Sequence, residues 1–347
     1  MPTTTRPTHR LLRSSFVDLL VGPHGIDRYL ELIRPNLTVV DARAEVVAVR
    51  HQTPRSVTLT LRPNAAFGGF TAGQFLRVGV EIDGVRRTRT FSPASSEHAR
   101  DGRLELTITQ RDGGLVTRHL RERVGPGTIL HLDARGRGEF VLPDDRPERL
   151  VLISGGSGIT PVLSMLRTLA EEGATDRVTF IHYARTREDF LYRAEVEALE
   201  GVDARFIATR EGGARLSADD LAGADCVAVC GPPPLIEAAR ELAPGHVLAE
   251  TFSPPTVTVA GEHATGTIRF TASGTEAQIV TGTLLEQAEA AGLTPEYGCR
   301  MGICHTCTCR KAAGAVKNIR TGEVSDEDDE DIQLCVSVPV GDVALTL

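Results

Sequence analysis

The sequence of 347 residues predicts a multidomain fold that combines an antiparallel β-barrel, an α/β doubly wound domain and a small α+β domain. Residues 41–145 contain short β-branched segments separated by Gly, Pro and Asp, which is typical of an antiparallel barrel. Strand-like and helix-like segments alternate over residues 146–251, and this alternation indicates a parallel sheet. A third set of strands, together with most of the cysteines, fills residues 256–347 after the stiff linker FSPPT.

Composition and charge limit the classes of protein to which the chain can belong. Hydrophobic residues make up 41% of the chain and charged residues 24%, as in globular proteins. No apolar run approaches the roughly 20 residues that a transmembrane helix needs, and Asp18 interrupts the apolar part of the N-terminal segment, which disfavours a signal peptide. We therefore expect a cytoplasmic protein without a transmembrane segment. The net charge of −8 does not favour nucleic acid as a partner.

Residues 1–40 predict an N-terminal helical extension. Apolar residues recur at helical spacing in two runs, which are Leu12, Phe16, Leu19 and Leu20, then Ile26, Tyr29, Leu30 and Ile33. Pro35 ends the second run. Arginines flank both runs, and they leave two interpretations open: the helices pack on the next domain, or they make peripheral contact with a membrane-bound partner.

Six segments of the predicted barrel have the composition of strands. They are EVVAVRHQT, SVTLTLRP, QFLRVGVEI, GVRRTRTFS, RLELTITQR and ILHLDARG. After the fifth, Gly113 and Gly114 precede Thr117 at the start of the helical segment RHLRERV. Glycines followed by a hydroxyl at a helix start form an anion site suited to a phosphate. An ordinary capped turn is the other interpretation.

A glycine-rich loop opens the doubly wound domain. The apolar run 150–153 predicts a buried parallel strand, and the turn after it contains Gly155, Gly156 and Gly158. We expect Thr160 to be the N-cap of the next helix, Pro161 to take its first position and Gly173 to end it. A pyrophosphate would meet free amides and the positive end of this helix.

Strands and helices continue to alternate up to residue 251. The predicted strands are RVTFIHYAR, ARFIATR and DCVAVCGPPP, and the predicted helices are EDFLYRAEVEALEG, SADDLAGA and LIEAARELA. Two cysteines lie in the last strand. Cys226 is expected to be a buried thiol without a functional role. Cys230 lies directly before the turn Gly231-Pro232.

Four cysteines near the C-terminus have the spacing of a plant-type iron–sulfur site. Cys299, Cys304 and Cys307 are spaced C-x4-C-x2-C, and Cys335 follows in DIQLCVSVPVG. Three thiolates from one loop and a fourth from a distant strand hold a [2Fe–2S] cluster in this pattern. Zinc is the main alternative, but structural zinc usually takes two short Cys or His pairs. A disulfide framework is less favoured, because seven cysteines are few and odd in number.

The segments around these cysteines have the element order of a β-grasp domain. GTIRFTAS, AQIV and an earlier VTVAG predict strands, and TLLEQAEAAG predicts a helix that ends at Gly292. Cys309 is expected to be a packed thiol, since four ligands complete the site. Residues 251–347 contain 13 acidic and 6 basic residues, a net charge of −7. Their acidic run 326–331 is either a solvated surface or a docking surface for a basic partner.

With these motifs in place, residues 41–347 resemble a ferredoxin-NADP reductase module followed by a plant-type ferredoxin domain. The chain is therefore similar to the flavin-dependent reductases with a C-terminal [2Fe–2S] domain. The resemblance implies FAD and a [2Fe–2S] cluster as cofactors, with NADPH as the nucleotide and NADH less favoured. It also implies that electrons pass from NADPH to FAD, then to the cluster, and then to an external acceptor protein.

The resemblance implies the residues of the flavin site. Arg89-Thr90-Phe91-Ser92 is similar to the family's R-x-Y-S motif, with Phe91 in place of tyrosine. In the family the arginine holds the flavin pyrophosphate, the aromatic ring covers the isoalloxazine and the serine bonds near N5, so Ser92 is expected to be catalytic. Further residues implied to bind FAD are Gly114, Val116 and Thr117, Phe140 of a G-x-G-x-F loop, and Phe252 of an E-x-F motif.

The nucleotide site is implied in the same way. The family's G-x-G-x-x-P motif corresponds to a loop with Gly156, Gly158, Thr160 and Pro161. Its C-G-P motif corresponds to Cys230-Gly231-Pro232, and Cys230 is expected to be catalytic beside the nicotinamide. A buried cysteine before a turn is the competing interpretation. Four residues at predicted strand ends are expected to bind the 2′-phosphate of NADPH, namely Arg185, Thr209, Arg210 and Arg215.

These parts predict an NAD(P)H-dependent flavin iron–sulfur oxidoreductase that reduces an oxygenase. The domain order and N-terminal extension resemble the actinobacterial-type partners of membrane di-iron fatty-acid desaturases. An acyl desaturase or related hydroxylase is therefore the first choice of acceptor, and a Rieske or other multicomponent oxygenase is the alternative. An iron–sulfur binding module that senses redox state is an alternative of a different class.

Overall fold

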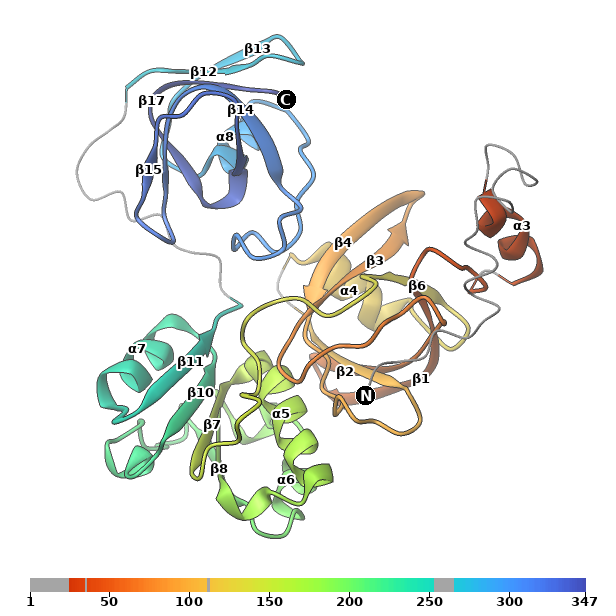
Figure 1. The fold of residues 1–347 in the computed structure, drawn as a ribbon, viewed down its shortest axis with the longest axis vertical. Helices are drawn as coiled ribbons and strands as arrows, with labels where there is room; N and C mark the ends of the chain where they lie inside the picture. The colour runs from red at the N-terminus through yellow and green to blue at the C-terminus, as the bar shows by residue number, and fades with distance from the viewer. Residues whose placement is uncertain (1–24, 35, 111–112, 253–264) are drawn as a thin grey trace. The chain divides into compact units, whose positions relative to one another are not determined.

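A computed structural model describes residues 25–34, 36–110, 113–252 and 265–347 (Figure 1). The chain divides into two compact units, Met1–Thr251 and Phe252–Leu347. The described part of the first unit contains two sheets, and that of the second contains one. None of the helices described is long and apolar enough to cross a membrane.

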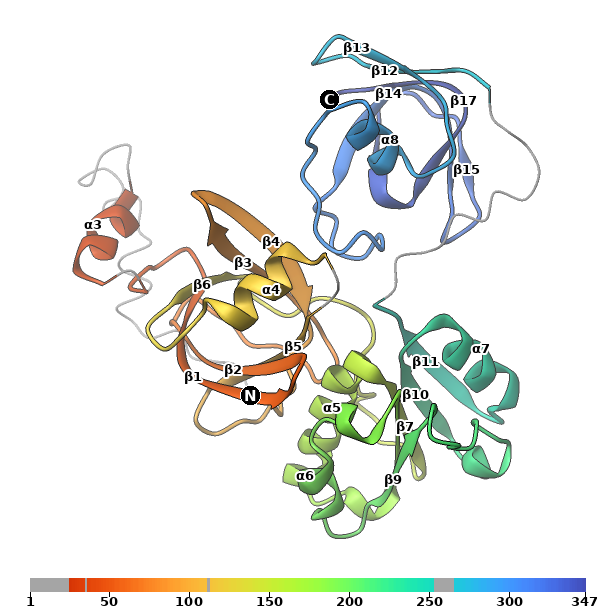
Figure 2. The same ribbon diagram turned by 180° about the vertical axis from the view of Figure 1, so that it is seen from behind.

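The first sheet has six antiparallel strands in the order β4-β3-β6-β1-β2-β5. They are β1 (Arg43–Thr53), β2 (Ser56–Pro63), β3 (Leu76–Ile82), β4 (Val85–Phe91), β5 (Leu104–Thr109) and β6 (Ile129–Leu132). Its two edge strands, β4 and β5, contact each other. The sheet therefore closes on itself (Figure 2), which confirms the predicted antiparallel barrel.

Alternating side chains fill the interior of this barrel, because successive residues of a strand point to opposite faces. In β5, Leu104, Leu106 and Ile108 are buried, and Glu105 between them is less so. Helix α4 (Leu115–Glu122) adds Val116 and Leu120 to the same core. The start of α4 is thereby fixed on the barrel.

The second sheet has five parallel strands in the order β11-β10-β7-β8-β9. Its elements are β7 (Leu150–Gly155), α5 (Ile159–Glu172), β8 (Val178–Ala184), α6 (Arg193–Glu197), β9 (Asp203–Ala208), β10 (Cys226–Cys230), α7 (Pro233–Leu242) and β11 (His246–Glu250). The chain runs outward from β7 to β9 and then returns to the other side of β7. This confirms the doubly wound prediction, and ligands of such sheets bind beyond the carboxyl ends of the strands where the order reverses.

The predicted start of α5 is wrong. The helix begins at Ile159 with Gly158 as its N-cap, so Thr160 is not the cap and Pro161 is the third helical residue. The Thr160 hydroxyl instead donates to the carbonyl oxygen of Ser157 at 3.3 Å. The cap is a glycine because the loop lies directly against the end of β10, where a Cβ would have no room.

The predicted helix at residues 217–224 is also wrong, while the predicted end of α5 is confirmed. Residues 217–224 were expected to be helical but form only the short 3-10 helix η5 (Asp219–Leu221). Gly223, with a φ of 72°, follows at once in the left-handed region that ends helices. Gly173, with a φ of 72°, is the C-cap of α5, as predicted.

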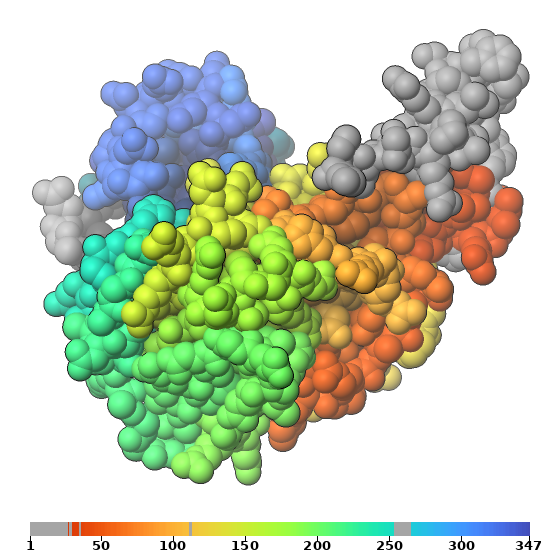
Figure 3. All heavy atoms as spheres, turned by 60° about the horizontal axis from the view of Figure 1, so that its bottom comes forward, coloured from red at the N-terminus to blue at the C-terminus, as the bar shows by residue number. Residues whose placement is uncertain are grey.

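The barrel and the parallel sheet pack against each other within the first unit (Figure 3). Tyr192, just before α6, is buried, and its hydroxyl is hydrogen-bonded to those of Thr58 and Thr107 in the barrel. Arg167 of α5 donates to the Glu105 carboxylate at 2.8 Å. Polar contacts therefore hold α5 and the start of α6 against the barrel.

The described part of the N-terminal extension contains helix α3 (Gly25–Ile33), the second of the two helices predicted there. The first predicted helix lies outside the described residues. Arg43 of β1 donates to the Glu31 carboxylate at 2.5 Å, and the amide of Val39 donates to the Asp27 carboxylate at 2.6 Å. The first contact attaches α3 to the barrel, and the second attaches it to the segment before β1.

The second unit has a mixed sheet in the order β13-β12-β17-β14-β15, with β16 paired to β14. Its elements are β12 (Thr267–Phe270), β13 (Thr275–Gln278), α8 (Leu284–Ala290), β14 (Thr308–Asn318), β15 (Val324–Ser325), β16 (Glu330–Gln333), η6 (Leu334–Val336) and β17 (Ser337–Leu345). Leu284 and Leu285 of α8 are buried in the core beneath the sheet. One helix packed on a mixed sheet confirms the β-grasp prediction. The predicted strand VTVAG lies in the part that is not described.

Candidate functional site

The structure brings the four predicted cluster ligands together. Three lie in the loop between α8 and β14, and Cys335 lies in η6. Cys304, Cys307 and Cys335 are buried, and Cys299 is partly exposed. Hydrogen bonds from the thiols of Cys304 and Cys335 lower the pKa of Cys299, and Cys335 likewise lowers the pKa of Cys307. Cys299 thus contacts Cys304 and Cys335, and Cys307 contacts Cys335. Sulfur atoms gathered in this way can hold a metal cluster once they are deprotonated.

Backbone amides of the same loop point at these sulfur atoms. Cys299 N–H donates to the sulfur of Cys304 at 3.2 Å, and Met301 N–H donates to that of Cys299 at 3.3 Å. Gly302 N–H donates to the sulfur of Cys335 at 3.2 Å. Such bonds stabilise thiolates and raise the reduction potential of a cluster. The donors and the burial fit a [2Fe–2S] cluster.

Two glycines give the loop its shape. A Cβ at Gly298 would lie 2.8 Å from the sulfur of Cys304, and Gly302 has a φ of 72° with no room for a Cβ beside Val336. The guanidinium of Arg320 donates to the Gly302 carbonyl at 3.0 Å. Arg320 could not be identified from the sequence, because no motif connects a turn residue after β14 to the cysteine loop.

The predicted flavin motif ends β4 and begins the loop after it. Arg89, Thr90 and Phe91 are partly buried, and Ser92 is 2% exposed. The Ser92 hydroxyl has no hydrogen-bond partner among the residues that the structure describes. A buried hydroxyl without a partner costs about 1–3 kcal/mol, so this one is suited to a ligand atom. It fits the predicted contact with the flavin.

The start of α4 fits the predicted phosphate site. Gly114 is the N-cap and supplies no side chain, and the Thr117 hydroxyl donates back to the Gly114 carbonyl at 3.3 Å. Gly114 therefore gives the first helical turn no side-chain cap, and amides at a helix start suit an anion. The Val116 side chain is buried in the barrel core, so Val116 can contribute to a phosphate site only through its backbone.

Two aromatic residues of the predicted flavin site lie further from this motif in the chain. Phe140 is 6% exposed and lies under Gly73, where an added Cβ would be 2.2 Å from the Phe140 carbonyl and 2.5 Å from Met165 of α5. Phe140 thus belongs to the packing between the barrel and the parallel sheet. Phe252 follows β11 and is the first residue of the second unit. The roles expected for both residues stay predictions.

The two loops predicted to bind the nucleotide lie against each other at the carboxyl ends of β7 and β10. A Cβ at Gly158 would be 2.3 Å from the carbonyl oxygen of Cys230. A Cβ at Gly155 would be 2.7 Å from Pro232 Cδ, and one at Gly231 would be 3.2 Å from the amide of Gly155. Only glycine allows this approach. The loops meet where the strand order reverses, which is where dinucleotides bind to such sheets.

Cys230 is fully buried at this junction. Burial, followed by the nearby Glu250 carboxylate, raises the pKa of its thiol well above the ordinary value. The thiol therefore stays protonated at neutral pH. It is therefore neither a thiolate nucleophile nor a base, and its expected place beside a nicotinamide stays a prediction.

The residues predicted to bind a 2′-phosphate lie at the carboxyl ends of β8 and β9. The amides of Thr209 and Arg210 donate to the carbonyls of Ala184 and Arg185 at 2.9 Å each, which extends the pairing of the two strands. Arg185, Arg210 and Arg215 are exposed, and none of them forms an ion pair with a carboxylate in the described part of the chain. Unpaired guanidinium groups at this edge fit a phosphate.

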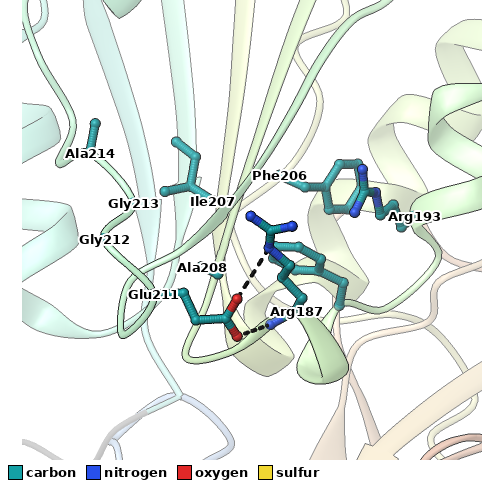
Figure 4. Close-up of a pocket in the computed structure, with 10 residues that line it drawn as sticks. Arg187, Arg193, Phe206, Ile207, Ala208, Glu211, Gly212, Gly213 and Ala214 are labelled. Carbon is teal, nitrogen blue, oxygen red and sulfur yellow. Dashed lines mark hydrogen bonds and ion pairs between the residues drawn. The ribbon is translucent and has the colours of Figure 1, made fainter.

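A pocket of about 380 Å³ on the same edge was not predicted (Figure 4). Arg187 and Arg193 line it together with Glu211. Arg187 and Arg193 were passed over because arginine is common on protein surfaces and no motif includes them, whereas Glu211 ends the segment Thr209-Arg210-Glu211, which resembles the family's S-R-E. The one available signal was the position of Glu211 directly after Arg210.

Three family models match the chain in order. The model of the oxidoreductase FAD-binding domain matches residues 45–140, and that of the oxidoreductase NAD-binding domain matches residues 152–241. The model of the 2Fe-2S iron-sulfur cluster binding domain matches residues 270–340. These matches confirm the predicted FAD, nicotinamide nucleotide and [2Fe–2S] cluster, and they do not separate NADPH from NADH.

Known proteins are similar to this chain over most of its length. An NADPH oxidoreductase of Mycobacterium tuberculosis is 33% identical over 339 residues, covering 92% of this chain and 88% of the relative. A glycine betaine monooxygenase reductase subunit of Pseudomonas aeruginosa is 30% identical over 323 residues, covering 80% and 87%. The solved structure of phthalate dioxygenase reductase shares the fold, with a TM-score of 0.62 and 24% identity over 88% of this chain and 97% of that one. The chain belongs to the family of flavin-dependent oxidoreductases that join an FAD-binding domain, an NAD-binding domain and a C-terminal 2Fe-2S domain.

Proposed function

We propose that this oxidoreductase is the reductase component of an oxygenase system, and that it passes electrons from NADPH through FAD and the [2Fe–2S] cluster to a separate protein. The observation that carries the proposal is the convergence of four cysteine sulfur atoms, with three amide donors, in the same chain as the flavin and nucleotide sites. The bound cofactors would supply the conversion of a two-electron donor into single-electron transfers. The protein sets the position and environment of each cofactor.

Turnover with a one-electron acceptor tests this proposal. Protein prepared without oxygen and supplied with iron, sulfide and FAD should reduce cytochrome c rapidly when NADPH is added. A redox-sensing module, the alternative of a different class, would bind the nucleotide without turnover. Nucleotide binding in the absence of any acceptor reduction would therefore contradict the reductase proposal.

For the acceptor, we propose a membrane-bound di-iron fatty-acid desaturase or a related hydroxylase. The support comes from the N-terminal extension, where Leu32 is 82% exposed, Ile33 74%, Leu37 44% and Val40 61%. Exposed large apolar side chains within one short segment favour contact with a protein or membrane surface. The alternative acceptor is a Rieske or other multicomponent oxygenase, which the monooxygenase reductase relative favours. Reconstituted turnover with one acceptor of each class distinguishes them.

Replacing Leu32 and Ile33 together by Asp should weaken transfer to a membrane-bound acceptor. The rate of reconstituted turnover should fall at least about fivefold, because buried apolar contacts dominate protein interfaces. Reduction of ferricyanide by NADPH should stay unchanged, since α3 lies far along the chain from the nucleotide loops. Val85→Asp is the matched control, because Val85 is 48% exposed on the barrel. An equal effect of the control would contradict a role for α3 in docking.

Arg210→Ala should weaken the binding of NADPH far more than the binding of NADH. A guanidinium that bonds to a phosphate contributes about 1.5–3 kcal/mol, so KM for NADPH should rise roughly 10-fold to 100-fold. KM for NADH, which lacks the phosphate, should change little. Arg240→Ala removes the same charge from an exposed position in α7 and serves as the control. Equal effects on the two nucleotides would refute the assignment of Arg210.

A further inference from the structure

Helix α5 lies on the side of the parallel sheet that faces the barrel, and its start and its body contact different loops (Figures 1 and 2). Its N-cap, Gly158, belongs to the loop that lies against Cys230 at the predicted nicotinamide site. Further along the helix, Ser164 and Arg167 bond to the barrel loop that follows the predicted flavin motif. One helix therefore connects the two predicted sites.

The Ser164 side chain forms the first bond to the flavin loop. Its hydroxyl donates to the carbonyl oxygen of Ser95 at 2.6 Å, and the two residues are buried, at 0% and 6% exposure. Ser95 is three residues after Ser92, whose buried hydroxyl is suited to a flavin atom. Loss of a buried hydrogen bond is costly, because it leaves an acceptor without a partner and away from water. The bond thus holds the flavin loop on α5.

Arg167 forms a second bond to the same loop, one residue nearer to Ser92. Its Nη1 donates to the carbonyl oxygen of Ala94 and to the Glu105 carboxylate, at 2.8 Å each. Its Nε and Nη2 donate to the two oxygens of the Glu195 carboxylate at 2.6 and 2.9 Å. A guanidinium group is planar and rigid, so this set of bonds fixes its position. The Ala94 carbonyl is fixed with it.

The separation of the two loops is set by the helix that joins them. Six residues of helix lead from the Gly158 cap to Ser164, a span of about 9 Å. On the barrel side, Ala94 is held from both directions, since its amide donates to the Glu105 carbonyl at 2.8 Å and its own carbonyl accepts from Arg167. The two loops cannot move apart unless these bonds break.

We propose that Ser164 and Arg167 are positioning residues for hydride transfer, which hold the flavin loop and the nicotinamide loop at the separation that the reaction needs. The proposal rests on the proposed function and concerns its first step. In that step the C4–H bond of NADPH breaks, and its proton and both electrons form the N5–H bond of FAD, which gives NADP+ and the reduced flavin anion. Both residues act through the loops, because their side chains bond to carbonyls and carboxylates of the protein.

Ser164→Ala in the full-length protein tests the proposal by stopped-flow reduction of the bound FAD with NADPH. Reacting atoms must come within about 3–3.5 Å, and a misplacement of about 1 Å can reduce a rate about 100-fold. Loss of one of the two bonds should allow part of this movement, so the rate at saturating NADPH should fall roughly 10-fold. The Kd of NADPH should stay unchanged, because the substitution leaves the residues of the nucleotide loops in place.

A spectrum adds a readout that a loss of stability alone would not change. Stacked nicotinamide and flavin rings give a long-wavelength charge-transfer absorbance, which weakens as the rings separate. This absorbance, measured without oxygen after NADP+ is added to the reduced protein, should be weaker in Ser164→Ala than in the wild type. Ser56→Ala is the matched control, because Ser56 is 3% exposed and its hydroxyl bonds to that of Thr109 between two strands of the barrel. The control should keep both the rate and the absorbance.

Arg167→Lys is the second variant, and it decides the matter if Ser164→Ala does not fold. Lysine keeps the positive charge between Glu105 and Glu195 but cannot form the planar set of bonds. The rate of flavin reduction and the charge-transfer absorbance should therefore fall together, as in Ser164→Ala. Arg205→Lys is the control, because that arginine pairs with two aspartates within the parallel-sheet domain. It should change neither quantity.

An unchanged rate at saturating NADPH in Ser164→Ala and Arg167→Lys would overturn the proposal. So would a fall no larger than in the controls, or a loss confined to the Kd of NADPH. If the variants slow flavin reduction but the wild type reduces no cytochrome c, the reductase proposal fails while the positioning role stands. If the wild type reduces cytochrome c and both variants behave like it, only the positioning role fails.

Discussion

Cys304→Ser should abolish cytochrome c reduction and leave the reduction of flavin by NADPH intact. Cys304 is 1% exposed, and its sulfur accepts the amide of Cys299 at 3.2 Å. A serine hydroxyl there is a poor iron ligand, so the cluster loses one of its four thiolates. We expect the rate of cytochrome c reduction to fall at least about 100-fold. Replacing residues that only support metal ligands already costs about 10-fold to 100-fold in activity. Stopped-flow absorbance separates this rate from that of flavin reduction.

Cys309→Ser is the matched control for this experiment. Cys309 is also buried, at 6% exposure, and lies two residues after Cys307. Its sulfur contacts the carbonyl oxygens of Arg310 and Thr346 instead of the other thiols. The variant should keep the cluster and its cytochrome c activity. Loss of flavin reduction in Cys304→Ser would contradict the division of labour between the two units.

Gly158→Ala should disrupt the nucleotide site. The added Cβ would be 2.3 Å from the carbonyl oxygen and 2.7 Å from the carbonyl carbon of Cys230, and backbone atoms cannot rotate away. The two loops must therefore separate. A displacement of about 1 Å at a reacting centre can reduce a rate about 100-fold, so the rate of flavin reduction by NADPH should fall by about this factor. Overpacking should also lower the free energy of unfolding by about 1–3 kcal/mol.

Gly173→Ala separates the catalytic effect from the loss of stability. Gly173 ends the same helix with a φ of 72°, and an added Cβ meets nothing within 4 Å. The left-handed conformation should make this variant less stable by about 1 kcal/mol. Flavin reduction should keep its rate. If Gly158→Ala and Gly173→Ala lose flavin reduction equally, the effect belongs to stability and not to the junction of the two loops.

Features governed by local chemistry could be predicted from the sequence. Alternating buried residues in β5 indicate an antiparallel sheet with one buried face. The continuous apolar run of β7 indicates a parallel strand that is buried on both faces. The ligands Cys299, Cys304, Cys307 and Cys335 could be identified because a cluster of fixed size constrains their spacing. The structure brings these four sulfur atoms together, and the matching family models contain the implied cofactor domains.

Features governed by distant contacts could not be predicted. Threonine is a common N-cap residue, so Thr160 was a reasonable prediction. Gly158 is the cap instead, because its backbone lies close to Cys230. That close approach depends on the order of the strands. Arg187 and Glu211 are 24 residues apart and meet only because β8 and β9 are neighbours. Local propensity contains no information on either contact.

The most direct test of the account is an anaerobic titration of the wild-type protein with NADPH, followed by visible absorption and electron paramagnetic resonance. We predict bleaching of a flavin band together with the paramagnetic signal of a reduced [2Fe–2S] cluster, and in Cys304→Ser the bleaching without the signal. Protein that remains colourless after supply of iron, sulfide and FAD would contradict the account. So would a flavin that NADPH reduces while the cluster of the wild-type protein stays oxidised.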